Sequence, residues 1–261
     1  MKTRAFTHFL LSAFLVLLTG CQPESTPLAT ESPLATEESA TATPAQSEEP
    51  AMQISADINL DPALAQDADS AMISQYLYEG LVRLDESGAP QPALAESWVI
   101  SDDQLDYIFT LRSIAVFSDG TPITPDVIVD NFNRWFDPQH PLHGNGDFTA
   151  WERTFLGFHG EKDASDRAKS TVDGIQKVDV NTVLIHLNRP MPDLLTGLAD
   201  PAFAILNPTA LASAGYGARD SVIISSGPYI VSAWTDNGLT LAPNPSYWGN
   251  KPTEDLNFIW R

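Results

Sequence analysis

Phe117-Ser-Asp-Gly-Thr-Pro122, with Thr124-Pro-Asp-Val127 directly after it, is the stretch that decides the fold. Its Ser118-Asp119-Gly120 segment predicts a turn. Thr124 then supplies a capping hydroxyl, Pro125 suits the first helical position, and Asp126 places an acid at the positive end of the helix dipole. The next residues predict a helix that ends at Asp137-Pro138, with one buried face made by Ile128, Phe132, Trp135 and Phe136.

Before this stretch, the pattern predicts strands and one more helix. We expect a strand over 52–58, a helix over 70–78 capped by Asp69, and a strand over 81–84 that ends at a turn near Ser87-Gly88. A hairpin is expected from 98–101 and 106–111, because Tyr107, Phe109 and Leu111 alternate with other residues.

After the central helix, the pattern loses its period over 139–170, where we expect a long surface excursion with one helical turn. Strands then dominate. Hairpins are predicted from 175–180 with 183–187, and from 229–234 with 239–242 around Asn237-Gly238, a pair that tolerates positive φ. Short apolar strands are predicted at 203–206 and 256–260.

The N-terminal segment has a different composition. Lys2 and Arg4 precede an apolar run from Phe9 to Leu18 that is too short to span a bilayer comfortably, which predicts a signal peptide over 1–20. Leu18-Thr-Gly-Cys21 resembles the lipobox of bacterial lipoproteins, in which the cysteine is acylated and becomes the new N-terminus. Residues 22–50 hold no Lys, Arg or aromatic residue, so we expect 21–50 to be a lipidated N-terminus and disordered tether.

Composition excludes several classes of protein. The formal charge of −20 disfavours binding to a nucleic acid, because it repels phosphate backbones. A single cysteine permits no internal disulfide and no cysteine-based zinc site. An apolar fraction of 43% is too high for a wholly disordered chain.

No nucleophile elbow, phosphate-binding loop, dinucleotide fingerprint or zinc-protease motif occurs in the sequence. A metal site would have to use His140, His143 and His159 with a neighbour such as Asp147, and an acid/base pair would have to come from Asp102 with Asp103 or Asp163 with Asp166. We expect these side chains to be solvated loop residues, and we predict no cofactor, no metal and no catalytic residue. The aromatic residues that fit the strand and helix periods least well are candidates for a ligand surface: Tyr78, Phe148, Trp151 and Tyr229.

Several blocks resemble the solute-binding proteins of ABC transporters for oligopeptides, dipeptides and nickel, extracellular solute-binding protein family 5. The most specific is Phe109-Thr-Leu-Arg112 followed by the 117–127 stretch. The others, in chain order, are Leu60-Asp-Pro62, Tyr78-Glu-Gly-Leu81, Gly88, Pro92-Ala-Leu-Ala-Glu-Ser-Trp98, Ser226-Gly-Pro-Tyr229 and Asn244-Pro-Ser-Tyr-Trp248.

The resemblance implies an α/β fold of the periplasmic-binding-protein-like type II class, in which a ligand is trapped between two lobes. It implies that this chain supplies one lobe: a sheet domain made by 51–58 plus 171–261, with a small inserted α+β subdomain over 59–170. Family members have a second lobe beyond the Trp248 region, so the resemblance implies a fragment or a single-lobe protein. The strand at 256–260 is then expected to meet that second lobe.

The resemblance also implies ligand contacts. It places Gln66, Asp67 and Ala68 at the ligand, with further contacts from 143–151, where Phe148 is the candidate aromatic and Trp151 lies at the end. Tyr229 is added as a ligand-surface candidate from its poor fit to the strand and helix periods. The implied function is a non-catalytic protein that captures peptides or similar solutes for a membrane permease. It would be held by its lipid at the bacterial cell membrane and face the periplasm or the cell exterior. A surface-anchored hydrolase and a single-lobe adhesive or sensory module are the alternatives.

Overall fold

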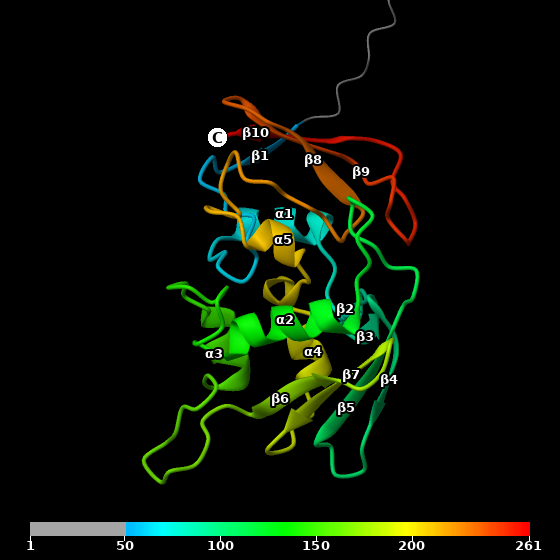
Figure 1. Cartoon of the computed structure of the whole chain (residues 1–261). Coiled ribbons are helices and arrows are strands. Elements are labelled where there is room, and N and C mark those ends of the chain that lie inside the picture. Colours follow the sequence, from blue (N-terminus) through cyan, green and yellow to red (C-terminus); the bar gives the residue numbers. More distant parts are fainter. Residues whose placement is uncertain (1–50) are drawn as a thin grey trace, which may run out of the picture. The chain divides into compact units, whose positions relative to one another are not determined.

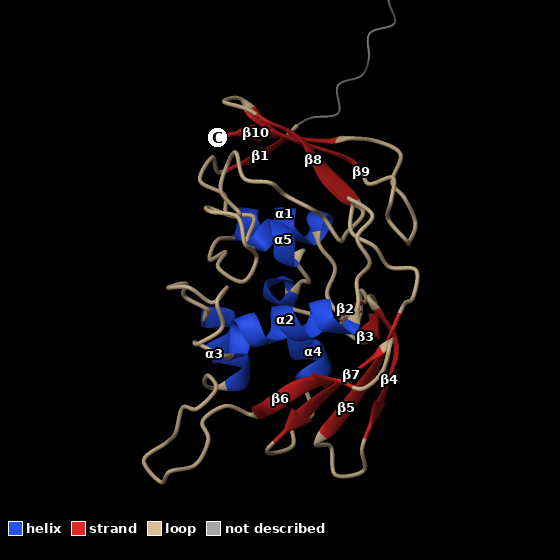
Figure 2. Cartoon of the chain, in the orientation of Figure 1, coloured by secondary structure: helices blue, strands red, loops and turns tan. Residues whose placement is uncertain are grey.

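The structure is a computed structural model that describes residues 51–261. The expected signal peptide 1–20, the acylated Cys21 and the tether 21–50 lie outside the described residues. Two four-stranded sheets stand at opposite ends of this body, and the helices lie between them (Figures 1 and 2). The described part of the chain has no helix that is long and apolar enough to cross a bilayer.

The first sheet has the strand order β1-β10-β9-β8. Its strands are β1 (Met52–Ile54), β8 (Tyr229–Trp234), β9 (Gly238–Pro243) and β10 (Leu256–Trp260). β10 pairs in parallel with β1 and antiparallel with β9. Both edges of β10 are therefore hydrogen-bonded within this body, so the strand presents no unpaired edge to a second lobe.

The turn between β8 and β9 forms where it was predicted, but for another reason. Neither Asn237 nor Gly238 has a positive φ. Instead, a Cβ at Gly238 would lie 2.1 Å from the Phe258 carbonyl oxygen. Glycine at 238 thus allows β10 to approach β9 closely.

The second sheet has the order β4-β5-β7-β6. It contains β4 (Ala95–Ile100), β5 (Asp106–Leu111), β6 (Val172–Lys177) and β7 (Thr182–Leu187), and both predicted hairpins are confirmed. β7 pairs with β5, with Phe109 opposite Val183. The boundary drawn at residue 171 is therefore corrected: 172–187 belongs to the sheet begun inside 59–170, because its buried residues complete that core. A small hairpin joins β2 (Val82–Leu84) to β3 (Pro90–Pro92).

The helices are α1 (Ala68–Leu77), α2 (Pro125–Phe136), α3 (Thr149–Phe155), α4 (Leu194–Leu198) and α5 (Pro208–Leu211), with a 3-10 turn η1 at Pro201–Phe203. Thr124 caps α2 as predicted, and Asp137 ends it. Asp67 rather than Asp69 caps α1. Asp69 instead accepts hydrogen bonds from the Ser55 amide and Arg261. The strand predicted at 203–206 is replaced by η1 and an extended segment.

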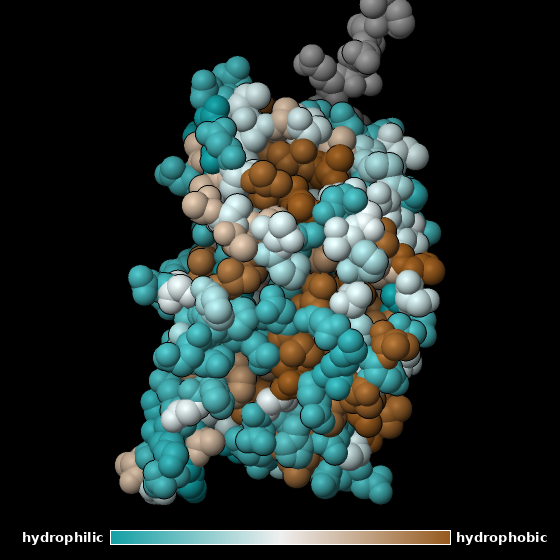
Figure 3. All heavy atoms as spheres, in the orientation of Figure 1, coloured by the Kyte–Doolittle hydropathy of each residue, from teal (hydrophilic) through white to brown (hydrophobic). Residues whose placement is uncertain are grey.

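The 139–170 excursion is only partly at the surface. α3 buries Trp151 and Phe155 in the core, and the Trp151 ring meets Phe132 of α2 edge-on at 5.2 Å. The aromatic side chains of α2 and α3 thus pack on each other between the helices and the second sheet. On the face in Figure 3, apolar atoms lie in separate groups among polar ones.

The 117–122 stretch is hydrogen-bonded to the segment that leads into β8. Phe117 is fully buried, and Gly120 has φ +85°, as a tight turn after Asp119 requires. Ser118 exchanges two hydrogen bonds with Ser225, its amide donating to the Ser225 carbonyl and its hydroxyl accepting from the Ser225 amide. Two residues on, the Gly227 amide donates to the Leu77 carbonyl at 2.9 Å, and a Cβ there would meet that backbone at 2.8 Å.

Candidate functional site

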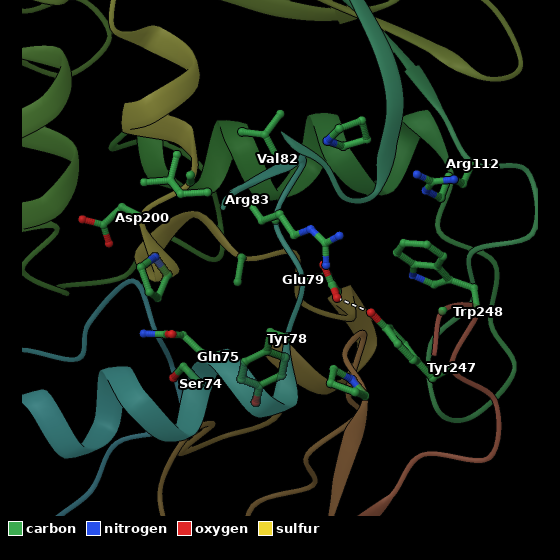
Figure 4. A pocket seen from close by; sticks show the side chains of 18 of the residues that line it. Ser74, Gln75, Tyr78, Glu79, Val82, Arg83, Arg112, Asp200, Tyr247 and Trp248 are labelled. Atoms are coloured by element: carbon green, nitrogen blue, oxygen red, sulfur yellow. Dashed lines mark hydrogen bonds between the residues drawn. The ribbon is translucent and has the colours of Figure 1, made fainter. Parts of the chain in front are cut away.

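Two neighbouring cavities lie along α1 and η1, and both are lined by Gln75, Asp200 and Pro201. The first, the arginine cavity, measures about 720 Å³ and is lined by Glu79, Arg83, Arg112, Tyr247 and Trp248 among others (Figure 4). The second, the α1 cavity, measures about 540 Å³ and includes Gln66, Asp67, Ala68, Thr149 and Ala150. Because they share these lining residues, the two cavities are neighbours, and together they form the candidate binding surface.

The α1 cavity is lined by the three residues that the family resemblance implied at the ligand. Gln66, Asp67 and Ala68 at the start of α1 face Thr149 and Ala150 at the start of α3. The Gln66 amide nitrogen donates to Asp147 at 3.4 Å, across 81 residues of sequence. Asp67 is engaged locally, since its carboxylate accepts from the Ser70 amide at 2.8 Å and the Ser70 hydroxyl at 2.6 Å. Asp67 therefore orients α1, and Gln66 is the more available polar side chain.

A buried ion pair holds the turn that leads into this cavity. Both Nη atoms of Arg134 on α2 donate to the Asp61 carboxylate, and the two side chains are only 3% and 4% exposed. Arg134 Nε also donates to the Leu142 carbonyl at 3.0 Å. The Tyr78 hydroxyl donates to the Leu60 carbonyl at 3.0 Å. Leu60-Asp61-Pro62 is thus fixed from α1 and α2 together.

The aromatic ligand candidates Phe148, Trp151 and Tyr229 differ in burial. Phe148 is 2% exposed and Trp151 1%, so the structure contradicts their assignment to a ligand surface. Phe148 stacks on His143 at 4.3 Å, and Trp151 donates from Nε1 to the Gly157 carbonyl at 2.9 Å. Tyr229 is half-buried in β8 and meets Tyr76 edge-on at 5.7 Å, and it does not line either cavity.

The arginine cavity is built around Glu79. Its carboxylate accepts a hydrogen bond from the Tyr247 hydroxyl (Figure 4). Burial raises the pKa of Glu79, against the smaller lowering by that hydrogen bond and by the nearby Arg83 and Arg112. Burial and the adjacent carboxylate raise the pKa of the Tyr247 phenol. Burial therefore disfavours ionisation of both groups, while the hydrogen bond from Tyr247 favours the carboxylate form of Glu79.

The two arginines enter the arginine cavity from different strands. Arg83 lies on β2, and Arg112 follows β5. Arg112 Nε donates to the Ala93 carbonyl at 2.7 Å, and its guanidinium lies 4.6 Å from the centre of the Trp248 ring. Sequence reasoning did not place these residues at a site, although Glu79, Arg112, Tyr247 and Trp248 all stand in the blocks that carried the resemblance.

The histidines and three of the four paired acids, Asp103, Asp163 and Asp166, have local partners. His140 Nε2 lies 3.1 Å from Asp130, His143 Nδ1 lies 2.7 Å from the Arg134 carbonyl, and His159 Nδ1 lies 3.7 Å from Asp137. Among residues 51–261, no group of three or more His, Cys, Asp or Glu side chains is placed to hold a metal ion. Asp163 accepts from the Arg167 and Ser165 amides, which lower its pKa and suit a turn rather than proton transfer.

Comparison with known proteins places this geometry in a family. Residues 89–256 match the bacterial extracellular solute-binding proteins, family 5 (middle). The chain is 30% identical over 200 residues to the periplasmic murein peptide-binding protein of Escherichia coli (strain K12), covering 75% of this chain and 36% of that protein. It is also 30% identical over 215 residues to haem-binding protein A of Haemophilus influenzae, covering 77% of this chain and 38% of that protein.

A solved structure of a similar protein has the same fold over most of this chain. The structure of HbpA2 from Haemophilus parasuis superimposes with a TM-score of 0.69 at 29% identity, over 81% of this chain and 42% of that one. The fold is thus that of type II periplasmic-binding-protein-like proteins. The chain spans little more than a third of the length of the curated relatives it matches. The chain belongs to the bacterial extracellular solute-binding proteins of family 5.

Proposed function

We propose that this protein is the solute-binding component of an ABC transporter, and that it captures peptides or similar small solutes outside the cell membrane for import through a permease. Binding would be non-catalytic, with closure of the protein around the solute. We further propose that Cys21 carries the lipid that holds the protein at the membrane, with 22–50 as a tether.

The observation that supports this most is the α1 cavity. The segment that family resemblance assigns to the ligand, Gln66 to Ala68, meets the start of α3 in one open hollow beside the arginine cavity. Together the cavities offer an amide, carboxylates and guanidinium groups on a rigid wall. Such a surface suits a polar solute of peptide size.

Peptides are the solute class we favour, because the murein peptide-binding relative carries a peptide in its name. A hydrolase is less well supported, because the acids and histidines considered for catalysis or metal binding, Asp102 apart, have local partners. The carboxylates in the cavities likewise have assigned partners.

Native mass spectrometry of the full chain, purified from its own host, tests the proposal. We expect a co-purified small solute that denaturation releases, and dipeptides to pentapeptides that compete with it. Gln66→Ala would weaken peptide binding, and Gln176→Ala, on the exposed part of β6, is the matched control. Failure of every peptide to bind or compete would refute the peptide assignment.

A further inference from the structure

The arginine cavity holds guanidinium groups whose outer donors are unused. Arg83 makes no hydrogen bond or ion pair with any other side chain in 51–261, although it lines the cavity. Arg112 uses Nε alone, on the Ala93 carbonyl, and its two terminal nitrogens have no partner in the same range. Because a guanidinium carries five N–H donors, several donors of these two arginines have no protein partner within 51–261.

One of the two groups is held in place before any ligand arrives. Trp248 stacks against the Arg112 guanidinium, and the Ala93 carbonyl fixes its inner edge. In Figure 4, Trp248 lies between Arg112 and Tyr247, and the Arg83 side chain extends toward Glu79. A stacked, hydrogen-bonded guanidinium loses little rotamer freedom when its outer edge binds a planar anion.

Within 51–261, no acid on the cavity wall forms an ion pair with these arginines. Glu79 accepts from the Tyr247 hydroxyl and forms no ion pair with Arg83 or Arg112. Burial raises the pKa of Glu79, and the Tyr247 hydrogen bond and the nearby charges of Arg83 and Arg112 lower it. Asp200 is paired with Arg153 at 2.8 Å and caps η1 through the Ala202 amide. Two unpaired cations thus converge in a chain whose formal charge is −20.

We propose that Arg83 and Arg112 bind a carboxylate of the captured solute in the arginine cavity. This rests on the proposed solute-binding function and adds the chemistry of one end of the ligand. A carboxylate matches the guanidinium fork in shape and charge, and charge-assisted pairs of this kind are the stronger class of hydrogen bond.

A titration that needs no knowledge of the solute tests the site. Sodium succinate is added to the 261-residue chain at constant ionic strength, with sodium chloride as the reference, while the Arg112 Nε–H and Trp248 indole N–H signals are followed by ¹⁵N NMR. We expect saturable shifts of both signals. Arg83→Gln would weaken succinate binding about tenfold. Arg219→Gln removes an exposed arginine that pairs with Asp236 away from both cavities, and it would leave binding unchanged.

A calorimetric arm links the site to peptides, with alanyl-alanine compared with its C-terminal amide. We expect the free acid to bind about tenfold more tightly than the amide, and Arg83→Gln to remove that difference. Equal affinity of acid and amide would overturn the carboxylate assignment while the proposed function stands. Succinate binding without binding of any peptide would leave the anion site intact and refute the peptide assignment. Absence of succinate shifts, or equal shifts in Arg83→Gln, would overturn the inference itself.

Discussion

The Asp61–Arg134 pair gives the sharpest prediction, because it is buried and joins a family block to the candidate site. In Asp61→Asn the carboxylate is lost while its shape is kept. Arg134 then stays charged, 3% exposed, with the Leu142 carbonyl and a weakened amide contact as its only acceptors. Removing one partner of a buried pair costs about 3–5 kcal/mol, because an uncompensated charge remains.

Urea unfolding measured by tryptophan fluorescence tests the magnitude. With a slope of about 2 kcal/mol per M for a body of this size, the midpoint falls by roughly 1.5–2.5 M. Asp236→Ala, which breaks the exposed pair with Arg219, is the matched control and is expected to cost at most about 1 kcal/mol. The double variant Asp61→Leu with Arg134→Met removes both charges and is expected to recover part of the loss. If Asp61→Asn costs no more than Asp236→Ala, the reasoning is refuted.

Three further predictions follow from burial and from the N-terminal pattern. Since the raised pKa of Glu79 means that the folded state holds this proton more tightly, stability falls as pH rises above the ordinary value of 4.5; Glu79→Gln flattens that fall in thermal melts recorded between pH 4 and 8. Trp151→Ala costs about 3–5 kcal/mol in urea unfolding, whereas a ligand-surface role would leave stability almost unchanged. Cys21→Ser moves the protein from the membrane to the soluble fraction, and an unchanged detergent partition would contradict the anchor.

Local patterns predicted most of the elements. The helix start at Thr124-Pro125-Asp126 and the buried face of α2 are present where caps and periodicity placed them. The predicted hairpins are also present, around 102–103, 181 and 237–238. Each depends on neighbours in sequence, since a cap, a turn and a repeat of apolar residues act over a few positions.

Local sequence patterns did not predict which strands pair when they are distant in the sequence. The register of β5 with β7 brings residue 109 beside 183, and nothing local in either strand specifies that partner. The burial of Phe148 and Trp151 was missed for a similar reason. A seven-residue helix between loops has too few turns to show a period, so aromatic residues that fill the core resembled residues left free for a ligand.

The two cavities of the candidate site differ in the same respect. The family resemblance implied Gln66 to Ala68, because they follow the Leu60-Asp-Pro62 turn, and these residues line the α1 cavity. The sequence did not predict the arginine cavity, because the walls of this cavity come from β2, the end of β5, η1 and the 247–250 loop. Its charged residues occur singly along the chain, and only the tertiary contacts of Glu79 and Trp248 bring them together.

Backbone hydrogen bonds around Glu79 hold the wall of the arginine cavity in place before a ligand binds. The Glu79 amide donates to the Ser226 hydroxyl at 3.0 Å, and its carbonyl accepts from the Ile205 amide at 2.8 Å. Ser226 in turn donates to the Ile205 carbonyl. Three segments distant in sequence are thus locked at one point behind the cavity wall. A solute that enters spends little free energy on ordering this wall, and the exposed Arg83 side chain is the main group left to be immobilised.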